Sequence, residues 1–206
     1  MRLTILFCSS LFLVAHATAQ EQHPHFRLSP VEFGSVAARC APGVPRDTLL
    51  AIARTESGLN PNAMSINRLK AVARTAGHAD GELILAKQPK DLNEAKSWLR
   101  WFSAHRYKVS IGLMQVNVET AEQLHLKPEQ LLDSCTNLRV AAAILIRLYT
   151  DSAREMGEGF SALDVALSLY NTGDSGMGFR NGYVANVYAH ADRADSAARA
   201  LKNADS

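Results

Sequence analysis

The chain has 206 residues, of which 47% are hydrophobic and 20% are charged, with a formal net charge of +2. This composition excludes a disordered polyelectrolyte and a collagen-like repeat. The balance of 22 basic against 20 acidic residues is not that of a nucleic-acid-binding domain, so no nucleic-acid partner is expected. The length predicts one compact domain with extensions.

Residues 1–19 are typical of a cleavable export signal. Arg2 precedes an uncharged apolar stretch over residues 3–15, and Ala17 and Ala19 are the small residues that a signal peptidase reads. The stretch is shorter than the about 20 residues that a permanent membrane anchor needs. We therefore expect cleavage after Ala19 and an exported chain without a permanent membrane anchor; an uncleaved anchor is the alternative.

The cysteines are candidates for a disulfide, and the histidines are candidates for metal ligands. Without residues 1–19, two of the three cysteines remain, Cys40 and Cys135. An oxidising compartment favours a disulfide between them, which would close a loop of about 100 residues; two unpaired buried thiols are the alternative. The remaining histidines show no metal-ligand spacing, so we expect no metal and no cofactor.

The remaining chain has mainly helical patterning. Residues 20–34 are predicted to form a tether, because residues 20–30 contain two prolines and two histidines and show no periodicity. A helix is expected to begin at Pro45 and to end at Gly58, which is followed by Asn60 and Pro61. Apolar spacing predicts further helices over residues 94–106, 120–125, 128–132, 137–154, 161–170 and from 183 to about 202.

The predicted fold class is mainly α, within an α+β arrangement. Residues 65–93 mix basic, glycine and apolar residues without a clear period, so this segment is expected to be irregular or short-stranded. A single helical domain is predicted over residues 35–190, and residues 191–206 form a polar C-terminal helix end or tail.

Glu56 is unusual because it shares one face of its predicted helix with Leu49, Ile52 and Ala53. Burial disfavours the charged form of a carboxyl group, and a protonated acid is what cleavage of a glycosidic bond requires. Two structural roles for Glu56 are the alternatives to catalysis. It could form an ion pair with Arg54 or a distant arginine, or its carboxyl group could lie in solvent at the edge of the helix face.

Five other polar residues are candidates for a binding site. Gln115 and Asn117 alternate with apolar residues and can bind sugar hydroxyls or N-acetyl groups, unless they are structural amides. Tyr170 and Asn171 lie at a predicted helix end beside a glycine-rich loop, although Tyr170 also suits a core position. Ser65, nine residues after Glu56, is also polar, but a short polar side chain taken alone favours a cap or turn position.

Three segments resemble the motifs of one family when they are taken together. Residues 53–61 (ARTESGLNP), 112–117 (GLMQVN) and 169–173 (LYNTG) resemble the Glu-Ser, Gly-Leu-Met-Gln and Ala-Tyr-Asn-x-Gly motifs of soluble lytic transglycosylases, which belong to the lysozyme-like superfamily. Leu169 stands where the family usually has alanine. Residues 40–42 (CAP) and 133–138 (DSCTNL) are similar to the subtype that accompanies type IV secretion systems.

The resemblance implies a lysozyme-like fold, with the short-stranded segment beside a catalytic groove, and a role for each matching residue. Glu56 becomes the single catalytic acid, Gln115 and Tyr170 line the site, and Ser65 is a candidate substrate contact. The implied substrate is the peptidoglycan glycan strand, cut between N-acetylmuramic acid and N-acetylglucosamine to leave a 1,6-anhydro end. The implied location is the periplasm, with envelope components of a secretion system as possible partners.

Two other functions remain open at this point. A muramidase would use water and a second carboxylate, for which the candidates are Asp80, Glu82, Asp91, Glu94 and Glu119. A non-catalytic periplasmic protein that binds glycan and assists assembly would keep the fold without the activity. The mass of the cleavage product separates the first possibility from a transglycosylase, because an anhydro end is one water lighter.

Overall fold

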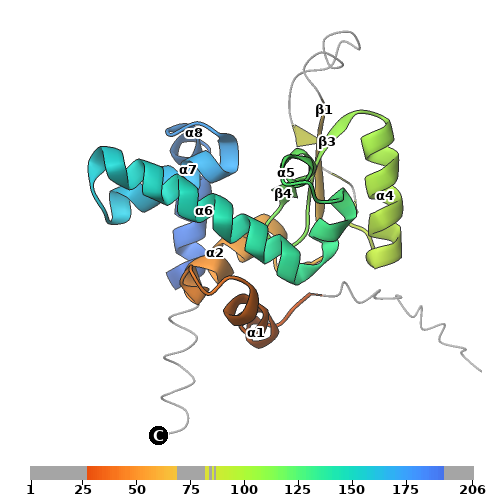
Figure 1. The fold of residues 1–206 in the computed structure, drawn as a ribbon, viewed down its shortest axis with the longest axis horizontal. Helices are drawn as coiled ribbons and strands as arrows, with labels where there is room; N and C mark the ends of the chain where they lie inside the picture. Colours follow the sequence, from red (N-terminus) through yellow and green to blue (C-terminus); the bar gives the residue numbers. More distant parts are fainter. Residues whose placement is uncertain (1–26, 69–81, 84, 86, 193–206) are drawn as a thin grey trace, which may run out of the picture.

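The computed structural model describes residues 27–68, 82–83, 85 and 87–192 (Figure 1). The predicted signal peptide, residues 20–26 of the predicted tether and residues 193–206 of the predicted tail lie outside this part. The fold is mainly α with one small sheet, which confirms the predicted fold class.

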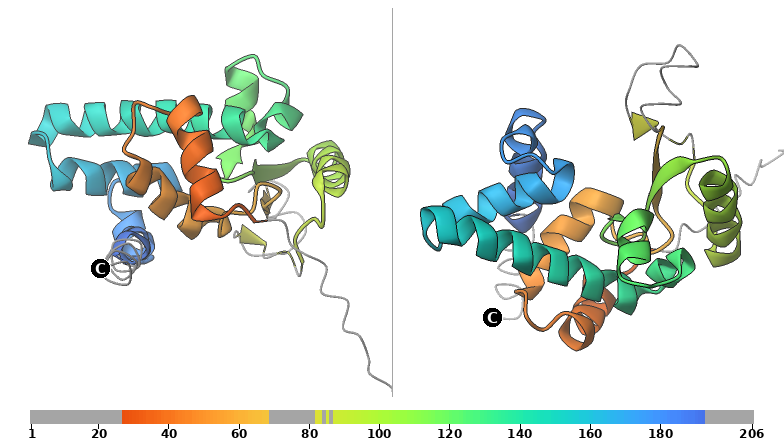
Figure 2. Two further views of the ribbon diagram at one scale, coloured as in Figure 1. Left: turned by 90° about the horizontal axis from the view of Figure 1, so that it is seen from below. Right: turned by 45° about the horizontal axis from the view of Figure 1, so that its top comes forward.

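Helix α2 (Arg46–Ser57) lies at the centre of the helical part, and Leu49 to Ala53 are all buried. Around it are α1 (Pro30–Cys40), α6 (Ser134–Met156), α7 (Phe160–Thr172), α8 (Met177–Arg180) and a helix over residues 183–192. Helices α6 and α7 form an antiparallel pair and lie side by side in both views of Figure 2. The predicted helices are therefore present in the described part of the chain, with boundaries shifted by a few residues; residues 193–202 of the last one lie outside that part.

Helix α1 begins at Pro30, so residues 30–34, the last part of the predicted tether, are helical. The reason is a capping box. The Ser29 hydroxyl accepts a hydrogen bond from the Glu32 backbone N–H at 3.2 Å, and the Glu32 carboxylate accepts one from the Ser29 backbone N–H at 2.8 Å. Pro30 then occupies the first turn, where its missing N–H costs nothing.

The sheet is antiparallel, with the strand order β2-β1-β3-β4. Its strands are β1 (Met64–Arg68), β2 (Glu82–Leu83), β3 (Tyr107–Ile111) and β4 (Val116–Asn117). The first two fall where short strands were expected. The other two were not predicted, because five and two residues give a weak alternation beside strong helical patterns on both sides.

The register of the sheet separates an apolar face from a polar one. Ser65 pairs with Ser110, and Ser110 pairs with Asn117, so these three side chains form a row across three strands. The opposite face buries its apolar residues under α4 (Leu92–Ala104), which packs against β3 (Figure 2, right). Helix α5 (Val118–Gln123) and the 3-10 helix η1 (Pro128–Leu132) connect the sheet to α6.

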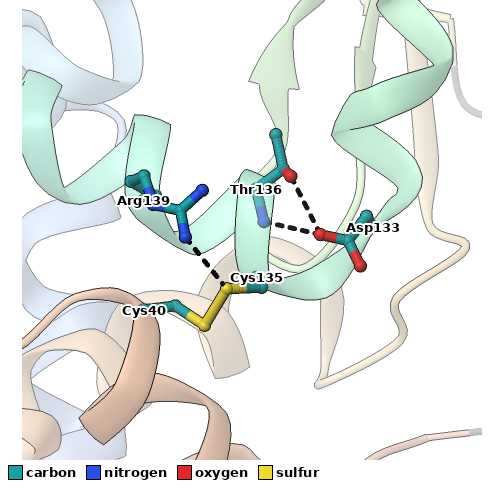
Figure 3. The surroundings of a disulfide bond; sticks show 5 residues. All are labelled: Cys40, Asp133, Cys135, Thr136 and Arg139. Carbon is teal, nitrogen blue, oxygen red and sulfur yellow. Dashed lines mark hydrogen bonds between the residues drawn. A yellow bond between two sulfur atoms is a disulfide. The ribbon is translucent and has the colours of Figure 1, made fainter.

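The predicted disulfide between Cys40 and Cys135 is confirmed, with the two Cα atoms 5.3 Å apart. It joins the last residue of α1 to the first turn of α6 (Figure 3). That turn is capped by Asp133, whose carboxylate accepts hydrogen bonds from the backbone N–H and the hydroxyl of Thr136. The bridge spans 95 residues, which include α2, the sheet and α4.

Removal of the disulfide is expected to destabilise the fold. In the double variant Cys40→Ser/Cys135→Ser, the free energy of unfolding should fall by about 2–4 kcal/mol, because the unfolded chain regains the entropy of a long open loop. Urea unfolding curves of the purified variant and wild type measure this difference. Wild type reduced with dithiothreitol should lose a similar amount; equal stability of oxidised and reduced protein would contradict the prediction.

Candidate active site

Glu56 lies in the last turn of α2 and is half-buried. The helix ends directly after it at Gly58, which has the left-handed φ of 57° that favours glycine. The Tyr183 hydroxyl donates a hydrogen bond of 2.5 Å to Glu56 Oε1. Arg54 was one predicted ion-pair partner of Glu56. Its Nη1 instead donates a hydrogen bond to the backbone carbonyl of His190 at 3.3 Å.

Two tyrosines surround this carboxyl group and remain neutral. Burial raises the pKa of Tyr183 far above its ordinary value, and the charge of Glu56 and the hydrogen bond to it raise it further. The pKa of Tyr170 is also raised, first by burial and then by the negative charge of Glu56. Both phenols therefore stay protonated at physiological pH and act only as neutral hydrogen-bonding groups.

The turn over residues 112–115 is held from α6 by Asn137, which is fully buried. Its side-chain oxygen accepts from the Met114 backbone N–H at 2.8 Å, and its Nδ2 donates to the carbonyls of Ile111 and Leu131 at 2.9 Å each. Gly112 has a φ of 82°, and a Cβ atom there would lie only 2.4 Å from Asn137 Nδ2. Only glycine therefore fits at this position.

The same turn accepts hydrogen bonds from two further helices. The Ser57 hydroxyl, next to the catalytic candidate on α2, donates to the Leu113 carbonyl at 2.8 Å. The Tyr170 hydroxyl on α7 donates to the Met114 carbonyl, also at 2.8 Å. Residues that lie far apart in the sequence thus meet at one stretch of backbone, which fixes their relative positions.

Gln115 follows this turn with a φ of 47°, an uncommon conformation for a residue other than glycine. Its Nε2 donates to the carbonyls of Ala63 and Gly112 at 3.0 and 2.9 Å. Both donors of the amide are thereby used, and its carbonyl oxygen remains as an acceptor for a ligand. Gln115 is therefore both structural and available for binding.

The site opens into a groove with two halves, of about 400 Å³ and about 440 Å³. Glu56, Ser65 and Gln115 line both halves, so they lie where the halves meet. All six predicted site residues line the first half, together with others that the sequence did not indicate: Ser110, Val116, Thr120, Ile144, Thr172 and Gly173. The second half is lined by residues of the α2 end, of β1 and of the segment before α4.

Two asparagines in the first half also have structural partners. Asn117 caps α5, because its side-chain oxygen accepts from the Glu119 backbone N–H at 2.8 Å. The Asn171 side-chain oxygen accepts from Asn181 Nδ2 at 2.9 Å. In both cases the side-chain oxygen is occupied, and the Nδ2 group is left as a donor for a ligand.

Glu56 is the only acidic side chain among the described residues that line the groove. Asp91 caps α4, the Glu94 carboxylate accepts from the Lys90 backbone N–H, and Glu119 forms an ion pair with Lys108. The side chains of the other two muramidase candidates, Asp80 and Glu82, lie outside the described residues. In the described part of the chain, no three histidine, cysteine or acidic side chains form a group that could hold a metal.

Sequence reasoning did not identify Tyr183 or Asn137 as part of the site. Each is the first residue of a predicted helix and was given no role, and Tyr183 is 127 residues from Glu56. Asn137 gave one usable signal, since an amide within an apolar helical stripe must find hydrogen bonds in the core. Nothing in the local sequence pairs Tyr183 with Glu56.

A helical domain and a small sheet that enclose a groove, with one glutamate at its centre, define the class of lysozyme-like proteins. The family model described as "Transglycosylase SLT domain" matches residues 35–192, and the chain belongs to this family. It is 36% identical to Protein virB1 of Agrobacterium tumefaciens (strain 15955) over 160 aligned residues. The aligned segment covers 78% of this chain and 61% of that protein.

A second relative is the Type IV secretion system protein virB1 of Brucella suis biovar 1 (strain 1330). The two chains are 32% identical over 168 residues, which cover 79% of this chain and 65% of the relative. The chain therefore spans less than two thirds of the length of these relatives. The family match and these two virB1 relatives confirm the predicted resemblance to the secretion-associated subtype.

Replacement of Asn137 is expected to destabilise the protein, because this amide holds the turn beside the site. Asn137→Ala leaves one buried N–H and two buried carbonyls without their partner, so the free energy of unfolding should fall by about 3 kcal/mol. Chemical unfolding measures the loss. Asn186→Ala, at an exposed position in the C-terminal helix, is the control and should change stability by less than about 0.5 kcal/mol. Similar values for both variants would refute the role given to Asn137.

Proposed function

We propose that the protein is a peptidoglycan lytic transglycosylase that cleaves the bond between N-acetylmuramic acid and N-acetylglucosamine and forms a 1,6-anhydro end. The observation that carries the proposal is a single half-buried acid, Glu56, at the junction of the two halves of the groove. A glycan strand that occupies both halves presents one glycosidic bond to this acid. Membership of the SLT family supports the same reaction.

The reaction needs only Glu56 and groups of the substrate. Protonated Glu56 donates its proton to the glycosidic oxygen as the bond to the anomeric carbon breaks, which leaves an oxocarbenium-like centre. The acetamido oxygen of the same sugar can stabilise that centre. Glu56, now ionised, takes the proton of the sugar's 6-hydroxyl, whose oxygen closes the 1,6-anhydro ring. The attacking hydroxyl is already attached to the reacting sugar, so it has an advantage over water.

Tyr183 is the positioning residue for this cycle. Its hydroxyl donates to Glu56 Oε1 and stays neutral, because burial raises its pKa. A neutral donor stabilises the ionised form without adding a positive charge that would hold the carboxylate permanently ionised. Glu56 can therefore serve first as an acid and then as a base.

The remaining groove residues are proposed to bind the acetamido sugars. Gln115 offers a carbonyl oxygen, which suits the N–H of an acetamido group or a sugar hydroxyl. Asn117 and Asn171 offer Nδ2 donors, which suit the acetamido carbonyl or ring oxygens. Ser65, beside Glu56 in both halves, is proposed as a further hydroxyl contact. Tyr170 shapes the first half and supports the backbone beside it.

We place this activity in the periplasm, after export by the signal at residues 1–19, where it opens the cell wall locally for a type IV secretion or related envelope system. The relatives named virB1, one of which is called a type IV secretion system protein, support this context. The residues that the structure describes contain no helix long and apolar enough to cross a membrane. Envelope components of that system are the proposed protein partners.

The product of the reaction tests the proposal directly. Purified cell-wall sacculi digested with the enzyme should release fragments one water lighter than hydrolysed fragments, as measured by mass spectrometry. Fragments with an ordinary reducing end would indicate a muramidase instead. A folded wild-type protein that releases no fragments would favour a non-catalytic glycan-binding role.

Glu56→Gln should reduce the rate of fragment release by about 10²–10⁴-fold, because it keeps the shape of the side chain but removes the transferable proton. Thermal unfolding and circular dichroism check that the variant is folded. Glu119→Gln, which alters an exposed ion pair outside the groove lining, is the matched control and should keep the wild-type rate. Full activity of folded Glu56→Gln would rule out the proposed acid.

Tyr183→Phe should shift the pH dependence of the reaction in a defined direction. Removal of a donor to the ionised carboxylate favours the protonated form, which is the form that begins the reaction. The alkaline limb of the pH–rate profile should therefore move to higher pH, while the maximal rate falls by about tenfold because the acid is less well positioned.

Tyr188→Phe provides the control for this measurement. Tyr188 lies on the same helix and donates a hydrogen bond of 2.6 Å to the Asp164 carboxylate, which does not line the groove. Its loss should leave the pH profile unchanged. A Tyr183→Phe profile that coincides with wild type would contradict the role proposed for this phenol.

A further inference from the structure

The segment before α1 lies against the end of α2 and contributes to the groove. The Leu28 backbone N–H donates to the Leu59 carbonyl at 2.9 Å, and Arg27 Nη1 donates to the Gly58 carbonyl at 2.9 Å. A Cβ atom on Gly58 would lie 2.3 Å from Arg27 Nη1, so the glycine permits the guanidinium to approach this closely. Arg27 thereby becomes part of the lining of the second half of the groove.

Arg27 is the only cationic side chain among the described residues that line either half. It is exposed, and within the described ranges no carboxylate lies within ion-pair distance of it. The Gly58 carbonyl occupies one of its five N–H donors. The rest of the planar guanidinium is available to a ligand, and its geometry matches a carboxylate.

We propose that Arg27 binds a free carboxylate of the peptide stem on the substrate, so that the enzyme prefers strands with acidic stems. The inference rests on the proposed function. The sugar chain itself carries no charge where stems are attached, because each lactyl carboxyl is then part of an amide bond. The peptide stems do carry free carboxylates, and a stem on a sugar in the second half of the groove would extend along its wall.

If Arg27 had only a structural role, its replacement would have a different effect on the rate of cleavage. As a cation near the C-terminus of α2, the guanidinium also stabilises the helix dipole and holds the segment before α1. Loss of that function would slow cleavage of all strands alike. Arg27→Gln separates the two roles, because glutamine can still donate to the Gly58 carbonyl but carries no charge. Arg27→Lys restores the charge without the planar fork.

The experiment compares two forms of one substrate. Uncross-linked glycan strands are prepared with their natural acidic stems, and a portion is converted so that every stem carboxyl is a neutral methylamide. Values of kcat/KM are measured on both forms for wild type, Arg27→Gln and Arg27→Lys. Arg39→Gln, at an exposed position on α1 outside the groove lining, is the matched control.

Wild type and Arg39→Gln should prefer acidic stems by about five- to tenfold, as expected for a partly exposed charge-assisted contact. This preference should decrease as the salt concentration rises. Arg27→Gln should reduce the ratio to about one, and Arg27→Lys should keep an intermediate value.

Two results would overturn the inference: a wild-type enzyme that cleaves both forms equally, or an Arg27→Gln variant that loses activity but keeps the preference. Failure of wild type to cleave either form would instead contradict the proposed function. Failure of this inference therefore remains distinguishable from failure of the proposed function.

Discussion

The site depends on hydrogen bonds to one stretch of backbone, the turn over residues 112–115. Asn137 from α6, Ser57 from α2 and Tyr170 from α7 each form a hydrogen bond of 2.8 Å with it. The turn has no side-chain bulk of its own at Gly112, so the amide of Asn137 reaches the backbone directly. These bonds fix the ends of α2, α6 and α7 relative to the turn, which connects β3 to β4 beside Glu56.

Several residues serve the fold and the site with different atoms of one side chain. In Gln115 the amide nitrogen holds the backbone while the oxygen is free, and in Asn117 the oxygen caps a helix while the nitrogen is free. A side chain anchored by one end loses little further entropy when its other end binds a ligand. A substitute at either position would therefore have to satisfy both partners.

The sequence was sufficient for the helices and for six of the residues that line the groove, but not for the geometry of the site. Amphipathic periodicity predicted the helices, since their apolar faces are long; strands β3 and β4 are too short to give such a signal. The motif spacing indicated Glu56, Gln115 and Tyr170, but not Tyr183, because a contact between residues 127 positions apart leaves no local pattern. The sheet register, which aligns Ser65 with Ser110, likewise arises only from tertiary pairing.

The electrostatics of the groove suit the two steps that the proposed reaction requires of Glu56. An acid that donates a proton and then accepts another must have both forms accessible, so neither form can be stabilised too strongly. Partial burial favours the protonated form, while the Tyr183 hydroxyl favours the ionised form. Both tyrosines stay neutral because burial and Glu56 itself raise their pKa values. In the proposed reaction the proton that moves is therefore that of Glu56 or of the sugar, and the phenols only keep the carboxylate in place.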